Sequence, residues 1–218
     1  MRTALLAGAT ALAALRAASS AAGEDAAPCG MEEAAPAEIA VVDADLDLLT
    51  PDGRRVALSG VEFPVEPGLR ARSRARLEAR VAPGRLVFLS VSSSTPDRWG
   101  RLPGALFVEG APGEAPLVSL AEALLREGLG RFRPDPAAFG CRNGLLAAEA
   151  EGRRRALGLW AAGEYVVVDA DRPDLLSGRK GMVVVEGVVG GIGEAGGSLY
   201  LNFGPRRWAD FAVVIWKR

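Results

Sequence analysis

The chain has 218 residues, of which 49% are hydrophobic and 24% are charged, and its formal net charge is −1. This composition is typical of a folded globular protein with room for one sizeable domain and a small additional module. Histidine is absent, which excludes serine–histidine and cysteine–histidine catalysis and any histidine-ligated metal. A metal site in this chain must be built from oxygen ligands, which favours a hard cation such as calcium.

Residues 1–22 predict a secretory signal peptide. A basic start at Arg2 precedes an apolar run over residues 4–15 and small residues at Ser20 and Ala22. A membrane anchor is the alternative, but the run is shorter than the roughly 20 residues that span a bilayer. We therefore expect a periplasmic or secreted protein with no stable membrane insertion after the leader is cleaved.

Cleavage after Ala22 would also change the charge of the chain. Without Arg2 and Arg16 the mature protein has 24 basic and 27 acidic groups, a formal charge of −3. Proteins that bind nucleic acid through their overall charge are basic. Any nucleic-acid binding by this protein must therefore depend on a local patch.

Two cysteines, Cys29 and Cys141, allow one intramolecular disulfide. An exported protein lies where disulfides persist, and a bridge over so long a loop would contribute roughly 4–5 kcal/mol if it is unstrained. The alternative is two free thiols.

The remaining segments predict an α+β protein. Residues 23–37 are acidic and rich in alanine and proline, which indicates a flexible tail. Strands are expected at 38–49, 54–61, 85–94 and 100–110, and helices at 68–81, 119–130 and 143–160. Residues 163–181 are interpreted as a linker, and residues 182–218 as a small mostly-β module with strands at 182–190, 198–203 and 211–216. An order in which strands come first, and helices are inserted between them or follow them, favours a small barrel.

Two helix starts carry cap signals, Ser119 with Glu122 three residues later, and Asn143. Gly152 should weaken the third helix by roughly 1 kcal/mol relative to alanine.

Four segments resemble the thermonuclease family, also called staphylococcal-nuclease-like proteins, and they follow that family's order: 41–64, 97–110, 120–132 and 145–160. The resemblance covers about residues 38–162 and implies an OB-like five-stranded β-barrel with about three helices. Residues 185–204 more loosely resemble the start of a second, abbreviated OB-type module.

The resemblance implies a site for one calcium ion and a phosphodiester. The family's Asp-Gly-Asp-Thr motif aligns with residues 43–46, which makes Asp45 a predicted metal ligand. Glu62 aligns with the second metal carboxylate, and Arg101 aligns with one of two arginines that act on the phosphate. Cations and arginines stabilise the charge that redistributes over phosphoryl oxygens.

Two of the family's catalytic positions are replaced in this chain. Ala57 stands at the other arginine position, and Val65 stands where the family has its catalytic glutamate. Arg55, two residues earlier on the same strand face, and Glu66, one residue later, are candidate substitutes. Losing a charge-stabilising group costs roughly 100- to 1,000-fold, and losing a general base costs roughly 100- to 10,000-fold.

Each of these functional interpretations has a purely structural alternative. The alternating Asp43, Asp45 and Asp47 could form a solvated strand edge, and Arg101 could serve as an ion-pair partner of Asp97. The arginines between Arg70 and Arg80 could follow a phosphate backbone or form a solvated helix face, and the aromatic rings of Trp208 and Trp216 could stack on bases or pack in the tail module.

Two hypotheses for function follow. The first is an exported, non-catalytic or weakly active protein that binds nucleic acid or a protein partner through an OB-type barrel. The second is a calcium-dependent nuclease or phosphodiesterase that uses a replacement base such as Glu66.

Overall fold

The computed structural model describes residues 27–162, 167–177, 183–206 and 209–217. The predicted signal peptide and Trp208 lie outside these residues. No helix in the described ranges combines the length and apolar character needed to cross a bilayer.

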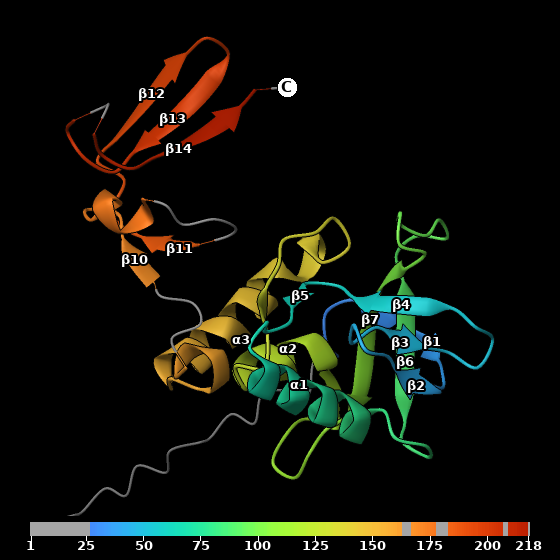
Figure 1. The fold of residues 1–218 in the computed structure, drawn as a ribbon. Coiled ribbons are helices and arrows are strands. Elements are labelled where there is room, and N and C mark those ends of the chain that lie inside the picture. Colours follow the sequence, from blue (N-terminus) through green and yellow to red (C-terminus); the bar gives the residue numbers. More distant parts are fainter. Residues whose placement is uncertain (1–26, 163–166, 178–182, 207–208, 218) are drawn as a thin grey trace, which may run out of the picture.

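The described residues form an α+β structure (Figure 1). The α-helices are α1 (Pro67–Arg80), α2 (Leu120–Arg126) and α3 (Arg142–Arg154). The 3-10 helices are η1 (Met31–Glu33), η2 (Phe139–Cys141), η3 (Gly158–Trp160) and η4 (Pro173–Leu176). The first nine strands are β1 (Ala35–Pro36), β2 (Val41–Val42), β3 (Leu48–Leu49), β4 (Arg55–Leu58), β5 (Val61–Glu62), β6 (Val87–Val91), β7 (Leu102–Glu109), β8 (Leu117–Ser119) and β9 (Arg131–Phe132). The last five are β10 (Val167–Asp169), β11 (Val184–Glu186), β12 (Gly191–Ala195), β13 (Ser198–Asn202) and β14 (Ala212–Trp216).

Seven strands form the main sheet. Six of them follow the order β1-β6-β7-β4-β3-β2, and β8 pairs with β7. The β4–β7 pair is parallel, whereas the other pairs in this sheet are antiparallel. β5 and β9 form a separate two-stranded ladder. The predicted α+β class and helices are therefore present, but no sheet of the described part closes into a barrel.

One predicted strand is interrupted. Residues 38–49 fold as β2 and β3, which pair with each other around a tight loop over residues 43–47. The alternation of aspartates therefore belongs to a turn between two strands and not to one strand face. The turn predicted at 50–53 is present between β3 and β4, where the Gly53 N–H donates to the Thr50 carbonyl at 2.9 Å.

The hydrophobic core lies between the main sheet and the three helices, which gather on one side of that sheet (Figure 1). Each helix contributes buried apolar side chains, for example Leu77 from α1, Leu124 from α2 and Leu145 from α3. Leu106 and Val108 of β7 are also buried. The helices thereby support the sheet that carries the predicted site.

The helix ends test the cap predictions. The Ser119 hydroxyl accepts a hydrogen bond from the Glu122 N–H at 3.4 Å, which confirms this cap. The predicted cap at Asn143 is wrong, because α3 begins one residue earlier and Cys141 occupies its N-cap. Gly152 has a packing reason: a Cβ there would lie 2.6 Å from the Leu125 carbonyl oxygen, so α2 and α3 approach closely only with glycine.

The segment predicted as a flexible tail is held in place over residues 27–36. A disulfide joins Cys29 to Cys141 with a Cα–Cα distance of 5.7 Å, which confirms the predicted pairing. β1 pairs with β6 in the register Ala35 to Leu89. The covalent bridge and the strand pairing together override the low hydrophobicity of the segment.

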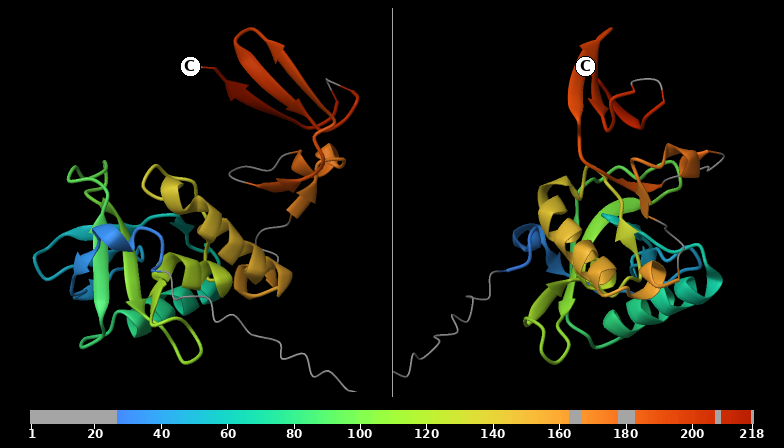
Figure 2. Two further views of the ribbon diagram at one scale, coloured as in Figure 1. Left: turned by 180° about the vertical axis from the view of Figure 1, so that it is seen from behind. Right: turned by 90° about the vertical axis from the view of Figure 1, so that its left-hand side faces the viewer.

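The C-terminal residues form small sheets beyond the main body. β10 and η4 lie within the predicted linker, and β10 pairs with β11 in parallel. β12, β13 and β14 form a three-stranded antiparallel sheet that stands apart from the main sheet and the helices (Figure 2). The predicted mostly-β character of this part is confirmed, and Trp216 at its end is 78% exposed.

Candidate functional site

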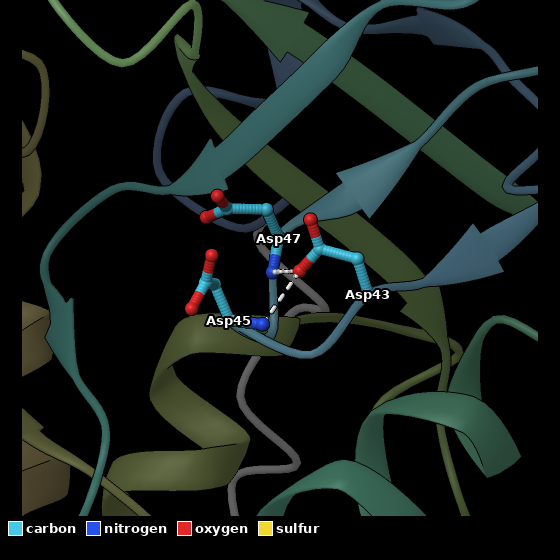
Figure 3. A group of neighbouring side chains, drawn as sticks. All are labelled: Asp43, Asp45 and Asp47. Atoms are coloured by element: carbon cyan, nitrogen blue, oxygen red, sulfur yellow. Dashed lines mark hydrogen bonds between the residues drawn. The ribbon is translucent and has the colours of Figure 1, made fainter.

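The loop between β2 and β3 brings three carboxylates together (Figure 3). One carboxylate oxygen of Asp43 accepts hydrogen bonds from the backbone N–H groups of Asp45 at 2.8 Å and Asp47 at 3.0 Å. Leu46 has a positive φ of 68° and a buried side chain, so a left-handed residue turns the chain within this loop. One oxygen from each aspartate lies within 4.8 Å of the others. We call Asp43, Asp45 and Asp47 the aspartate cluster.

The guanidinium of Arg55 lies against all three carboxylates of the aspartate cluster. Its Nη2 is 2.9 Å from Asp43 Oδ2 and 2.7 Å from Asp45 Oδ2, and its Nε is 2.9 Å from Asp47 Oδ2. A charge of +1 from the protein itself thus occupies the position where three carboxylates converge.

Arg101 directly precedes β7 and stands beside Arg55, the first residue of β4. Val56 of β4 is in register with Leu102 of the parallel strand β7, so the residues that precede them are also neighbours. Arg101 Nη1 lies 3.8 Å from Asp47 Oδ1. Asp47 is therefore the shared partner of two neighbouring arginines.

Burial sets the ionisation of this group. Desolvation of the buried Asp47 raises the pKa of that carboxyl above its ordinary value, with smaller opposing effects from Arg101 and Arg55. The hydrogen bond to Asp45 raises the pKa of the Arg55 guanidinium further above its ordinary value. The arginine therefore remains charged, whereas burial makes the charged form of Asp47 less favourable.

Helix α1 holds the aspartate loop from behind. Arg74 donates to the carbonyl oxygen of Val42 at 2.7 Å and to that of Asp43, and Arg70 donates to the carbonyl of Ala44 at 3.4 Å. These contacts give two arginines of the predicted phosphate-tracking run a structural role. The loop conformation is therefore fixed by residues outside it.

Arg101 also forms the ion pair with Asp97 that was the structural alternative. Its Nε and Nη2 lie 3.0 Å and 2.9 Å from Asp97 Oδ2. The Arg101 guanidinium lies 4.8 Å from the ring centre of Trp99, and that of Arg98 lies 3.9 Å from it. Despite partial desolvation, hydrogen bonds from the Arg101 backbone and side chain and from the Trp99 N–H lower the pKa of Asp97 to about 2.

Glu62 and Glu66 do not belong to the aspartate cluster. Glu62 Oε2 forms an ion pair of 2.5 Å with Arg131, which is buried, across the β5–β9 ladder. Glu66 is the N-cap of α1, and its carboxylate accepts from the N–H groups of Gly68 at 2.9 Å and Leu69 at 2.6 Å. These hydrogen bonds lower the pKa of Glu66 below its ordinary value. Both carboxylates therefore have structural partners, and a base role for Glu66 would compete with helix capping.

Val65 and Ala57, which stand at the two replaced positions, have surroundings that suit their small apolar side chains or leave them in solvent. Val65 is 76% exposed. Ala57 lines a cleft of about 440 Å³ together with Arg101 and Arg133. The exposed Arg133 was not singled out by the sequence, although its position shortly after the helix predicted over 119–130 and directly before Pro134 indicated a surface loop.

The arrangement fits a small hard cation in composition, since all three converging groups are carboxylates. It also fits the guanidinium that lies among them. The candidate site therefore consists of the aspartate cluster, Arg55, Arg101 and the adjacent cleft, and it lacks Glu62 and Glu66.

Comparison with known proteins identifies no family model that matches the chain, and no curated protein matches it.

Proposed function

We propose that this protein is an exported, non-catalytic binding protein with a degenerate thermonuclease-like site, which takes single-stranded nucleic acid in the cleft beside Arg101. The contact of Arg55 with all three aspartates carries this proposal. A guanidinium in the middle of the cluster supplies the positive charge that a calcium ion would otherwise supply. Binding of a cation would have to displace it.

The loss of catalytic groups supports the same conclusion. Val65 has no ionisable group, and the neighbouring Glu66 caps α1. Without a general base and without an arginine at residue 57, hydrolysis would be slower by roughly 100-fold or more for each loss. Calcium, if bound, would polarise a phosphoryl oxygen, but the chain offers no unengaged base beside it at the aligned positions.

The surface near Arg101 supports nucleic-acid binding. Trp99 is 57% exposed and can stack on a base, as aromatic side chains do in single-strand binders. Arg98 and Arg133 provide positive charge near the ring and the cleft, and no ion pair of Arg133 is found within the described residues. The exposed ring of Trp99 thus lies beside Arg101 of the cleft, which places an aromatic ring next to local cations on a chain that is not basic overall.

The proposal also includes a barrel fold, an OB-like C-terminal module and export of the protein. An OB-like five-stranded barrel would present this cleft on its side, and a short OB-like module over 182–218 would extend the surface. The disulfide is compatible with an oxidising compartment such as the periplasm or the exterior of the cell. A protein partner is the other candidate for this surface.

A second candidate function is a calcium-dependent phosphodiesterase, and the register of β4 and β7 favours it. Because Arg55 at the start of β4 and Arg101 directly before β7 are neighbours, a cation on the aspartates would leave two arginines side by side for one phosphate. In that case Asp45 would be a metal ligand, and Glu66 would have to leave the helix N-terminus to act as a base.

The test uses the chain from Gly23 onward with its disulfide intact, incubated with single-stranded DNA and RNA with and without calcium. We expect binding in the absence of calcium and no cleavage in its presence. An Asp45→Ala variant is the control. Calcium-dependent cleavage that this variant loses would overturn the proposal and establish the phosphodiesterase, and absence of any binding would overturn it in favour of a protein partner.

A further inference from the structure

A second, smaller hollow lies beside the cleft that contains Arg101. It has a volume of about 80 Å³, and it shares Ser59, Ser92 and Ala137 with that cleft. Ser90 and Ser119 also line it. The smaller hollow is therefore an extension of the cleft with hydroxyl groups in its wall.

Ser59 lies where the two hollows meet. The residue is 8% exposed, and its Oγ is buried with no hydrogen-bond partner among the described atoms. A hydroxyl can donate one hydrogen bond and accept others, and a buried one without partners is unfavourable. Ser93, which also lines the cleft, differs because its hydroxyl already bonds to the backbone of Thr95 at 3.1 and 3.2 Å.

The charges of the two hollows differ. Arg101 and Arg133 line the larger cleft together with Asp97 and Asp135, whereas the charged residues that line the smaller hollow, Glu33 and Glu122, are both acidic. A phosphate is therefore repelled by the smaller hollow and finds cationic partners in the larger cleft. At about 80 Å³ against about 440 Å³ for the cleft, the smaller hollow is the narrower of the two, and it suits a small hydroxyl-bearing group.

We infer that the cleft selects ribose over deoxyribose, with Ser59 Oγ as the hydrogen-bond partner of the 2′-hydroxyl of single-stranded RNA bound with its phosphate at Arg101 and Arg133. This inference rests on the proposed function, because it names the sugar that the same cleft takes. The 2′-hydroxyl is the group by which proteins tell RNA from DNA, and it both donates and accepts. Ser59 then gains the partner that it lacks among the described residues.

The experiment measures fluorescence anisotropy of a labelled oligouridine RNA and of the matched oligodeoxyuridine DNA in EDTA, which prevents metal-dependent cleavage. The wild-type chain should bind the RNA about threefold to tenfold more tightly, the range for one neutral hydrogen bond. Ser59→Ala should reduce the RNA affinity to that of the DNA and leave the DNA affinity unchanged. A 2′-O-methyl RNA should lose the same advantage on the wild-type protein, which tests the contact without any change to the chain.

Ser177→Ala is the matched control, because Ser177 is an exposed serine outside both hollows. It should keep the RNA preference. Equal affinities of the wild-type chain for RNA and DNA would overturn the inference and leave the proposed function standing. A preference that persists in Ser59→Ala would also overturn it. If neither oligonucleotide binds, the proposed function fails and the inference fails with it.

Discussion

Arg55 Nε and Asp47 Oδ2 lie 2.9 Å apart, yet both atoms are buried and neither makes a hydrogen bond within the described residues. The distance satisfies an ion pair, whereas the geometry does not satisfy a hydrogen bond. The two groups are therefore held by charge, and the directional hydrogen bond of Arg55 goes to Asp45. Asp47 Oδ2 therefore faces the positive charge of Arg55, but its capacity to accept hydrogen bonds is unused within the described residues.

Removing the Arg55 guanidinium should leave the negative charge of the aspartate cluster uncompensated. Arg55→Ala leaves three carboxylates close together without their counter-ion, so the free energy of unfolding should fall in calcium-free buffer. Millimolar calcium should restore much of the loss in the variant and change the wild-type Tm little. Thermal unfolding with and without calcium measures both effects.

The control for this variant is Arg54→Ala, because Arg54 pairs with Asp52 at 2.8 Å on the exposed turn and has no ion pair to the aspartate cluster within the described residues. It should show neither the loss nor the calcium response. An Arg55→Ala protein as stable as the wild type, and indifferent to calcium, would contradict the idea that Arg55 serves as the counter-ion of the cluster.

Replacing a buried arginine of α1 should lower the free energy of unfolding more than replacing an exposed arginine. Arg80 is 7% exposed, donates to the Glu109 carbonyl at 3.0 Å and pairs with Glu114 at 2.8 Å. Arg80→Met should lower the free energy of unfolding by about 2–3 kcal/mol, because two acceptors lose a buried donor. Arg85→Met removes a solvent-exposed pair with Glu109 and should cost under about 1 kcal/mol. Urea unfolding compares the two, and equal losses would refute the role of burial.

The Asp97 carboxylate should make stability depend on acid. Its pKa in the folded chain is about 2, below the ordinary 3.8, so the unfolded chain binds the proton more readily. The stability that this group contributes is present above about pH 4 and is lost as the pH falls towards 2. Asp97→Asn should therefore lower the stability between pH 5 and 7, and the gap to the wild type should narrow as the pH falls towards 2. Urea midpoints across pH decide this, and parallel curves for the two proteins would contradict it.

A close contact after α2 should make one glycine irreplaceable. Gly128 has φ +66°, and a Cβ there would collide with the carbonyl oxygen of Leu157. Gly84 has φ +82° but no atom within 4 Å of its added Cβ. Gly84→Ala should cost about 1 kcal/mol for the backbone alone, and Gly128→Ala about 2–4 kcal/mol because the clash adds to it. Chemical denaturation measures the difference, which would be absent if the chain relaxes freely at Gly128.

Local signals predicted most of the secondary structure. Ser119 with Glu122 placed the start of α2, and the Thr50–Gly53 turn was evident from proline, aspartate and glycine. Asp43–Asp47 was less readable, because a run of apolar and acidic residues looks the same in one strand and in two strands joined by a turn. Leu46 decides between them by adopting a left-handed φ, a conformation that its side chain does not suggest.

The sequence indicated which residues belong to the candidate site better than it indicated which ion pairs they form. Asp45, Arg55 and Arg101 were identified from the resemblance and the strand alternation, and they lie close together. Glu62 pairs instead with Arg131, a residue 69 positions away along the chain, which sequence spacing could not indicate. The partner of Arg55 was equally hidden, because the register of β4 against the aspartate loop depends on the tertiary fold.

The disulfide makes a covalent ring of the chain between Cys29 and Cys141, with 112 positions of separation. The main sheet and the aspartate cluster belong to this ring, whereas α3 and the C-terminal sheets form a branch outside it. If the protein is pulled by its ends, the tension passes from Cys29 through the two sulfur atoms to Cys141 and bypasses every strand from β1 to β9. The backbone of the candidate site therefore lies outside the covalent path of the tension while the bridge is intact, and tension reaches the ring through Cys141 and the contacts of α3.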